Sequence, residues 1–188
     1  CMDLHANQIQ GFFDIPVDHL YAINVLCDYF LTKKMKNMVV VSPDVGGLKM
    51  ARAYAKRLGA DLAIVDKRRA TPEKTEVMHV LGNVRGKNAI MVDDIIATGG
   101  SMIEAAEVLR KKGVKSIYAA VSHGILSGPA LERIRGCSVL KEVVITDSIP
   151  LRNPEKNPKV KVLSVAQLLA DAIARIHNEE SISSLFEE

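Results

Sequence analysis

The sequence predicts an α/β fold with a mostly parallel sheet flanked by helices. Two observations predict it. Short apolar runs alternate along the chain with longer segments whose apolar residues recur at helical spacing. No internal repeat or low-complexity stretch interrupts this alternation. Alternating strands and helices are typical of a sheet whose parallel strands are joined by crossover helices.

The expected strands are short apolar runs. In chain order they are Met38–Val41, Leu62–Val65, Val77–Val84 (with a turn at Gly82 and Asn83), Ala89–Val92, Ile117–Val121, Val143–Ile145 and Val160–Leu163. Their lengths suit strands rather than helices. The segment from Asp147 to Pro158 is polar and contains proline, so we expect a loop there.

The expected helices are longer and have recognisable ends. They are Val17–Lys34, a segment opened by Gly46 and Gly47 that runs to Leu58, Ser101–Lys112 and Ser164–His177. Gly59 and Gly113 follow two of them directly, as residues that end helices commonly do. Ser164 is typical of a residue that caps a helix N-terminus.

Composition excludes several classes of protein. The chain has 188 residues, of which 48% are hydrophobic, which is enough apolar material to build a core and excludes disorder as the dominant state. The net charge is only +3, and no apolar run is long enough to span a bilayer. Trp is absent and aromatic residues make up 4%, so stacking platforms for single-stranded nucleic acid are not expected. We therefore expect no nucleic-acid partner and no membrane partner.

The cysteines carry a further indication. Cys1, Cys27 and Cys137 have no CxxC spacing and no histidine cluster beside them, which argues against a zinc site. Three scattered cysteines suit reduced thiols, so we expect a cytoplasmic protein. The chain begins at Cys1 within what looks like a structured segment, and we expect it to start inside a domain of a longer protein.

The strongest chemical signal is the segment that reads Val-Asp-Asp-Ile-Ile-Ala-Thr-Gly-Gly-Ser from residue 92 to residue 101. An apolar strand ends in Asp93 and Asp94, and a glycine-containing loop then enters a helix. Exposed N–H groups at such a loop attract phosphate. The two carboxylates would repel a phosphate but suit sugar hydroxyls or Mg²⁺. A ribose 5-phosphate satisfies both halves; the alternative is a helix cap with solvated acids.

This segment resembles the phosphate-binding loop of type I phosphoribosyltransferases. Other segments resemble the ribose-phosphate diphosphokinases, which make 5-phosphoribosyl 1-diphosphate (PRPP). They are Met2–Asp14, Ser42–Gly47, Val65–Arg69, Ser122–Ala130 and His177–Phe186. The resemblance covers essentially the whole chain and corresponds to the C-terminal portion of a full-length PRPP synthetase.

The resemblance implies a reaction and an organisation. The family moves the β,γ-diphosphoryl group of ATP onto the C1 hydroxyl of ribose 5-phosphate with Mg²⁺, in homo-oligomers built from dimers and often hexameric. It implies three parts: residues 1–17 as a remnant of an N-terminal domain and a linker, 18–165 as the phosphoribosyltransferase-like domain that binds ribose 5-phosphate, and 166–188 as a C-terminal helix and tail that pack on the missing domain. Since the family's adenine contacts lie in the missing half, we expect this chain alone to be inactive.

The resemblance assigns the sugar-phosphate half of the site to the segment described above. Asp93 and Asp94 would hold the 2′ and 3′ hydroxyls of the ribose. The residues that would hold its 5-phosphate are Ala97, Thr98, Gly99, Gly100 and Ser101. The family usually has Asp where this sequence has Ala97, and Ala-Thr-Gly-Gly is common in adenine-type phosphoribosyltransferases. Because backbone donors would still bind phosphate, we expect phosphate binding to persist.

The diphosphate half is implied at two other loops. Lys67 and Arg69 match the family's catalytic pair and would stabilise charge on the transferring phosphoryl group. Without the resemblance, such a basic run is more typical of a solvated loop. Asp44, Gly46 and Gly47 match the diphosphate-binding residues, and a glycine pair at a helix start offers N–H donors to phosphate.

The remaining assignments concern metal and regulation. His5 and Asp44 match positions that contact Mg²⁺ in the family, although a histidine beside apolar residues is by itself more typical of a structural hydrogen-bonder. Further metal candidates are Asp3, Asp14 and Asp18, and regulatory candidates are Gln10, Ser181 and Ser183. The turn residue His123 is predicted to be structural.

Two alternatives stay open. One is a non-catalytic regulatory subunit of PRPP-synthetase type, which Ala97 favours and Lys67 and Arg69 disfavour. The other is an adenine-type phosphoribosyltransferase, for which the sequence offers no evident base-binding segment.

Overall fold

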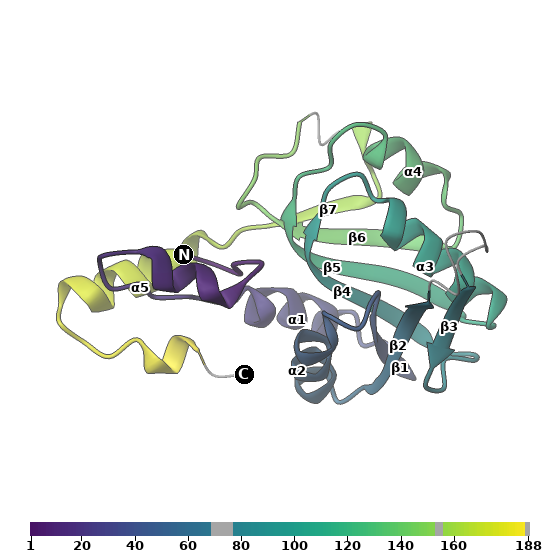
Figure 1. The fold of residues 1–188 in the computed structure, drawn as a ribbon, viewed down its shortest axis with the longest axis horizontal. Coiled ribbons are helices and arrows are strands. Elements are labelled where there is room, and N and C mark those ends of the chain that lie inside the picture. The colour runs from purple at the N-terminus through teal and green to yellow at the C-terminus, as the bar shows by residue number, and fades with distance from the viewer. Residues whose placement is uncertain (69–76, 153–155, 187–188) are drawn as a thin grey trace.

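The computed structural model describes residues 1–68, 77–152 and 156–186, and it contains a sheet of seven strands (Figure 1). The strands are β1 (Met38–Ser42), β2 (Asp61–Arg68), β3 (Val77–Leu81), β4 (Asn88–Ile96), β5 (Ser116–Gly124), β6 (Leu140–Thr146) and β7 (Val160–Leu163). The helices are α1 (Ile23–Thr32), α2 (Leu48–Leu58), α3 (Gly100–Lys111), α4 (Ala130–Gly136) and α5 (Ala166–His177), with short 3₁₀ helices η1 (Asn7–Phe12) and η3 (Ser183–Leu185).

The order of the strands in the sheet is β3-β2-β1-β4-β5-β6-β7. All neighbours are parallel except β2 and β3, which are antiparallel, so the expected mostly parallel sheet is confirmed. The chain moves outward from β1 to β3 and then returns to place β4 on the other side of β1. In open α/β sheets, ligands bind beyond the carboxyl ends of the strands at such a reversal of strand order.

The core lies on both faces of the sheet, because alternate strand residues point to opposite sides. Val39 and Val41 pack on the face covered by α3 and α4, whereas Val40 packs on the face covered by α1 and α2. Figure 1 shows these two helix layers on either side of the sheet. The apolar runs that predict strands are therefore runs buried on both faces.

Helix α1 begins at Ile23 rather than at Val17 because the preceding residues pair with the N-terminus. Leu20 N–H donates to the Cys1 carbonyl at 2.8 Å, and Asp3 N–H donates to the Leu20 carbonyl at 3.0 Å. These ladder-like bonds hold the segment extended, so it cannot start a helix. Helix α2 ends as expected, since Gly59 has the left-handed φ of 58° that favours glycine.

The N-terminal segment and α5 project away from the sheet (Figure 1). They bury little: η1 has no buried residue, and Ala172 is the buried residue of α5. Phe12 and Ile173 are 86% and 67% exposed. Among the described residues, no helix is both long and apolar enough to cross a membrane.

Candidate functional site

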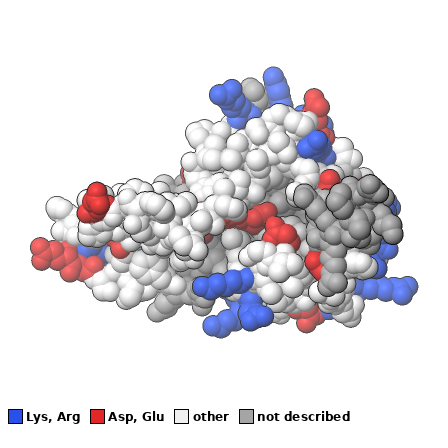
Figure 2. Space-filling model, viewed as in Figure 1, with Lys and Arg blue, Asp and Glu red and all other residues white. Residues whose placement is uncertain are grey.

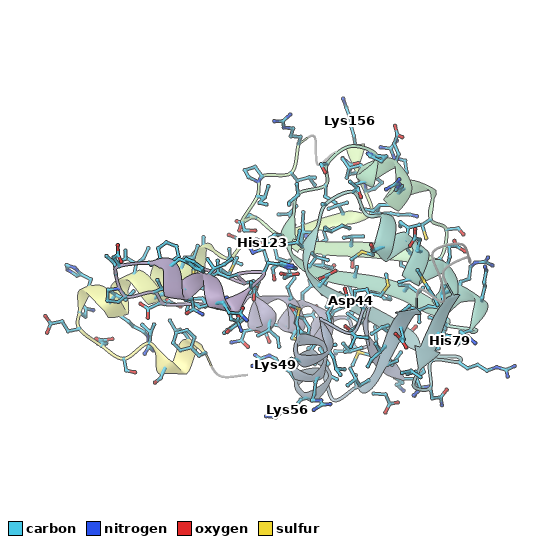
Figure 3. The ribbon with its side chains drawn as sticks, in the orientation of Figure 1. Asp44, Lys49, Lys56, His79, His123 and Lys156 are labelled. Carbon is cyan, nitrogen blue, oxygen red and sulfur yellow. The ribbon has the colours of Figure 1, made fainter. Side chains whose placement is uncertain are left out.

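The carboxyl ends of β1 and β4 lie side by side and open into a pocket of about 680 Å³. The predicted site residues in its lining come from three parts of the chain: the N-terminal segment, the loop after β1 and the end of β4. They are Asp3, His5, Asp44, Gly46, Gly47, Asp93 and Asp94, and further polar groups in the lining come from Asn7, Gln8 and Lys49. Figure 2 shows acidic side chains gathered at the centre of the molecule, and Figure 3 shows Asp44 there, between α2 and the sheet.

The carboxylate pair lies within β4, since this strand runs to Ile96, beyond the expected end at Val92. Asp94 N–H donates to Asp93 Oδ1 at 2.9 Å. Burial, together with the neighbouring Asp94, raises the pKa of Asp93 to about 7. A carboxyl pKa shifted this far in a pocket is typical of a functional site.

His5 contacts this pair from a segment far away in the sequence. Its Nδ1 lies 2.6 Å from Asp94 Oδ2, and this hydrogen bond raises the pKa of His5. The imidazole is mostly exposed, whereas the Asp94 carboxylate is mostly buried. The predicted metal candidate thus lies beside the predicted sugar-binding carboxylate, a contact that the sequence did not indicate.

Asp3 fixes the N-terminal segment that carries His5. Its Oδ2 accepts hydrogen bonds from Ser122 Oγ at 2.6 Å and from Ala22 N–H at 2.9 Å, and its φ is +41°, which non-glycine residues rarely adopt. His123 Nε2 lies 3.1 Å from the Asp3 carbonyl oxygen and donates to it. Figure 3 labels His123 where the N-terminal segment meets the sheet. The end of β5 thereby anchors the segment that carries His5. The hydrogen bond of His123 agrees with the structural role predicted for it, whereas the sequence did not indicate the contribution of Ser122.

The loop after β1 is held by its own residues. Ser42 Oγ donates to the Asp44 carbonyl at 2.6 Å, and Gly47 N–H donates to Asp44 Oδ1 at 2.9 Å. A Cβ at Gly47 would lie 2.8 Å from Ser42 Oγ, so a side chain there would force the loop to shift. The predicted diphosphate-binding residues therefore form one compact turn at the start of α2.

The loop after β4, from Ala97 to Ser101, is held by a distant segment instead. Leu126 N–H and Ser127 N–H donate to the carbonyls of Ile96 and Ala97 at 3.1 and 3.0 Å. Arg133 Nη1 donates to the Thr98 carbonyl at 2.9 Å. The loop is not part of the pocket lining but starts directly after the strand that carries Asp93 and Asp94.

The metal candidates divide into two groups. His5 and Asp44 line the pocket together with the predicted ribose-binding residues Asp93 and Asp94, while Asp14 and Asp18 do not. The carboxylate of Asp3 lines it too but is engaged by Ser122 and Ala22. Within the described ranges, no three or more His, Cys, Asp or Glu side chains form a group that could hold a metal ion.

The catalytic and regulatory candidates stay predictions. The backbone of Lys67 lies in β2 opposite Met78, and Arg69 lies outside the described residues. Gln10 Nε2 lies 3.2 Å from His19 Nδ1, and Ser181 Oγ donates to Ser183 Oγ at 2.9 Å. None of these regulatory candidates is in the pocket lining.

Comparison with known proteins gives concordant results. A family model described as the phosphoribosyl synthetase-associated domain matches residues 65–187. A ribose-phosphate pyrophosphokinase of Helicobacter hepaticus is 56% identical over 98% of this chain and 59% of its own length. One from Clostridium acetobutylicum is 51% identical over 100% of this chain and 59% of its own length. The chain thus spans about three-fifths of the length of these relatives.

Solved structures agree with the sheet described above. A phosphoribosylpyrophosphate synthetase from Mycobacterium smegmatis has a TM-score of 0.86 and 40% identity, over 95% of this chain and 58% of that one. An APRTase from Giardia lamblia has a TM-score of 0.51 and 22% identity, over 63% of this chain and 76% of that one, which shows a shared fold alone. The phosphoribosyltransferase-like fold is therefore confirmed.

The family match covers well over half of the chain and includes β4, its glycine loop and the segment that holds this loop from behind. The relatives extend the match to the N-terminal segment that carries His5. The chain belongs to the phosphoribosyl synthetase-associated domain family, and its resemblance to the PRPP synthetases is confirmed.

Proposed function

We propose that the protein is a ribose-phosphate pyrophosphokinase and that this chain carries the ribose 5-phosphate half of its active site. One observation carries the proposal. The carboxylates of Asp93 and Asp94 share a pocket with the loop after β1, at the point where the strand order reverses, and a glycine loop follows them directly. This arrangement offers one subsite for a sugar diol, one for its phosphate and one for a diphosphate.

The sugar phosphate is proposed to bind across the end of β4. Asp93 and Asp94 accept hydrogen bonds from the 2′ and 3′ hydroxyls, while N–H groups of the loop from Ala97 to Ser101 bind the 5-phosphate. The separation is physically reasonable, since adjacent carboxylates would repel a phosphate placed on them. Ala97 leaves the N–H donors of this loop intact, so phosphate binding does not need a side chain at that position.

The diphosphoryl group of ATP is proposed to bind at the loop after β1. Gly46 and Gly47 let the backbone approach closely at the start of α2, and Asp44 is the nearby acid. When bound, Mg²⁺ would neutralise charge on the diphosphate. His5, Asp44, Asp93 and Asp94 supply suitable donors in one pocket. Mg²⁺ typically uses one or two carboxylates together with substrate phosphates and water, so a preassembled group of protein ligands is not required.

The proposed reaction is an in-line transfer. The C1 hydroxyl oxygen of ribose 5-phosphate forms a bond to the β-phosphorus of ATP, and the bond from that phosphorus to the α–β bridging oxygen breaks. AMP leaves with the bridging oxygen, and the hydroxyl proton is released. Lys67 and Arg69 are proposed to stabilise the charge that spreads over the transferring group.

Further parts of the proposal concern the assembled protein. We propose that it acts in the cytoplasm as a homo-oligomer built from dimers, and that the segment 166–188 packs on a domain outside this chain. The exposed apolar residues of α5, Leu169, Ile173 and Ile176, are compatible with such packing. Gln10, Ser181 and Ser183 are proposed to belong to a regulatory anion site. Because ATP contacts are expected outside this chain, the chain by itself is proposed to bind ribose 5-phosphate without turnover.

The test is an assay for AMP and PRPP with ATP, ribose 5-phosphate and Mg²⁺ in the full-length protein. We expect product, and we expect Lys67→Ala to lower kcat on the order of 10²–10³-fold, as loss of a transition-state contact does. An unchanged rate would remove Lys67 from the mechanism. A folded protein that forms no product would favour a regulatory subunit. PRPP consumption with adenine would favour an adenine-type phosphoribosyltransferase.

A further inference from the structure

The loop after β4 is oriented by one distant segment. Three successive carbonyls of the chain, at residues 96, 97 and 98, accept hydrogen bonds from the stretch between residues 126 and 133. The bonds are Leu126 N to Ile96 O at 3.1 Å, Ser127 N to Ala97 O at 3.0 Å and Arg133 Nη1 to Thr98 O at 2.9 Å. The three carbonyls therefore face the start of α4.

The directions of these carbonyls also determine where the N–H groups of the loop point. In a trans peptide the N–H points opposite to the C=O of the same unit, and the described chain contains no cis peptide. With the Thr98 carbonyl directed to Arg133, the N–H of Gly99 is directed away from α4. In residues 1–68, 77–152 and 156–186, the backbone bonds include none donated by the N–H of Thr98 or Gly99. The N–H groups of Thr98 and Gly99 thus point to the side of the loop opposite α4, where Thr98 is exposed and Gly99 is buried.

The third bond differs from the other two because a side chain donates it. Backbone donors at Leu126 and Ser127 persist whatever their side chains are, whereas the bond to Thr98 requires Arg133. Of the three peptide units, the one between Thr98 and Gly99 also depends most on a hydrogen bond from outside the loop. Gly99 has a φ of +71°, and glycine adopts positive and negative φ with similar ease, so the peptide before it can rotate at little steric cost.

The guanidinium also fits closely against the loop. A Cβ at Gly100 would lie 3.3 Å from Arg133 Nη1, so glycine at the first residue of α3 leaves the space that Arg133 occupies. Arg133 therefore lies on the side of the loop to which its carbonyls point, opposite to the N–H groups of Thr98 and Gly99.

We propose that Arg133 is a positioning residue for the 5-phosphate of ribose 5-phosphate. It holds the Thr98–Gly99 peptide with its N–H toward the phosphate, and its charge strengthens the positive field at that N–H. The inference rests on the proposed function, since it takes this loop as the phosphate subsite. It assigns Arg133 no contact with the substrate.

The experiment compares Arg133→Ala and Arg133→Lys with a matched control, Arg135→Ala. Arg135 is on the same helix and also exposed, and the hydrogen bond described for it involves its carbonyl rather than its guanidinium. Ribose 5-phosphate binding is measured by calorimetry, and KM and kcat by steady-state kinetics, all on the full-length protein. We expect Arg133→Ala to raise Kd and the KM for ribose 5-phosphate at least 10-fold, with kcat and the KM for ATP changed less than threefold.

The variants separate positioning from general charge and from folding. Arg133→Lys keeps a charged donor and should recover part of the affinity, while Arg135→Ala should stay within twofold of the wild type. Equal losses in Arg133→Ala and Arg135→Ala would overturn the proposal in favour of long-range charge. If Arg133→Ala does not fold, the ribose 5-phosphate affinities of Arg133→Lys and Arg133→Gln are compared with that of the wild type. Weaker binding by Arg133→Gln, a neutral donor of different length, than by Arg133→Lys supports the proposal. Binding by both variants that equals that of the wild type overturns it.

These measurements distinguish failure of the proposed function from failure of the inference about Arg133. If the folded wild-type protein shows neither ribose 5-phosphate binding nor PRPP formation, the proposed function fails and the assignment to Arg133 fails with it. If the wild type binds and Arg133→Ala binds equally well, the proposed function stands and the inference about Arg133 is wrong.

Discussion

The two loops at the centre of the sheet hold their shape in different ways. The loop after β1 is fixed within six residues, by Ser42 and by the Asp44 carboxylate. The loop after β4 is fixed by a segment that lies about 30 residues further along the chain and includes Arg133. The first loop is therefore a local turn, and the second acquires its geometry only when β4, β5 and α4 are assembled. Substitutions should consequently act locally in one loop and through the whole site in the other.

The largest effect is expected for Gly99→Ala in the loop after β4. Its φ of +71° lies in the left-handed region, where a side chain costs about 1–2 kcal/mol. We expect that loss in the free energy of unfolding, measured by urea denaturation, together with at least 10-fold weaker ribose 5-phosphate binding. Gly136→Ala is the control, because a Cβ there meets nothing within 4 Å and its φ is not positive. Equal stability of the two variants would contradict the distinction.

The second comparison concerns the loop after β1. Asp44→Ala removes the acceptor for Gly47 N–H and should cost about 0.5–1.5 kcal/mol, as loss of one hydrogen bond does. Asp44→Asn keeps an oxygen at that place, so its stability should be close to that of the wild type. Both variants should weaken binding of Mg²⁺-pyrophosphate, measured by calorimetry, and leave ribose 5-phosphate affinity within twofold. A similar loss of both ligands would show that the two loops are not independent.

The third prediction concerns how Asp93, on β4, makes the free energy of unfolding depend on pH. The pKa of Asp93 is raised to about 7, so the folded chain binds more protons than the unfolded chain between pH 4 and pH 7. Its contribution to stability is therefore greatest in acid and is lost as the pH rises through this range. Asp93→Asn should flatten that part of the stability profile, and ribose 5-phosphate affinity in the wild type should increase as Asp93 ionises. An identical profile in both proteins would refute the assignment.

The smallest effect is expected at His5. The imidazole is mostly exposed, so its ion pair with Asp94 should contribute about 0–1 kcal/mol to stability. The contact should nevertheless be visible by NMR titration: the pKa of His5 lies above 6.5 in the wild type and should fall toward 6.5 in Asp94→Asn. A His5 titration that does not respond to Asp94→Asn would show that the pair does not persist in solution.

Sequence patterns predicted the parts of the molecule that local chemistry determines. The apolar runs in the sequence correspond to buried strands, and Gly59 follows the last residue of α2 as expected. The glycine loop before α3 lies between a strand and a helix, also as expected. The same patterns placed the end of β4 too early, because Asp93 and Asp94 looked like the start of a loop. In the structure the strand continues to Ile96, since β5 continues to pair with it as far as Gly124.

The parts that sequence patterns missed depend on distant contacts. Helix α4 has only seven residues, too few to show a helical period, and it carries Arg133. His5 and Asp94 are 89 residues apart, and Asp3 reaches Ser122 across 119. No local pattern records such contacts. They arise because the sheet places the ends of β4 and β5 beside the N-terminal segment.

The adjacency of β1 and β4 has a consequence for how the protein folds. Met38 pairs with Asn88, so this contact closes a long stretch of chain that includes α2, β2 and β3. Closing such a stretch costs entropy before any pairing compensates it, and pairings of this kind form slowly. Ribose 5-phosphate should therefore accelerate neither the collapse of the chain nor the early pairing of β2 with β3. It should slow unfolding, because its complete binding site exists only after β1 has paired with β4.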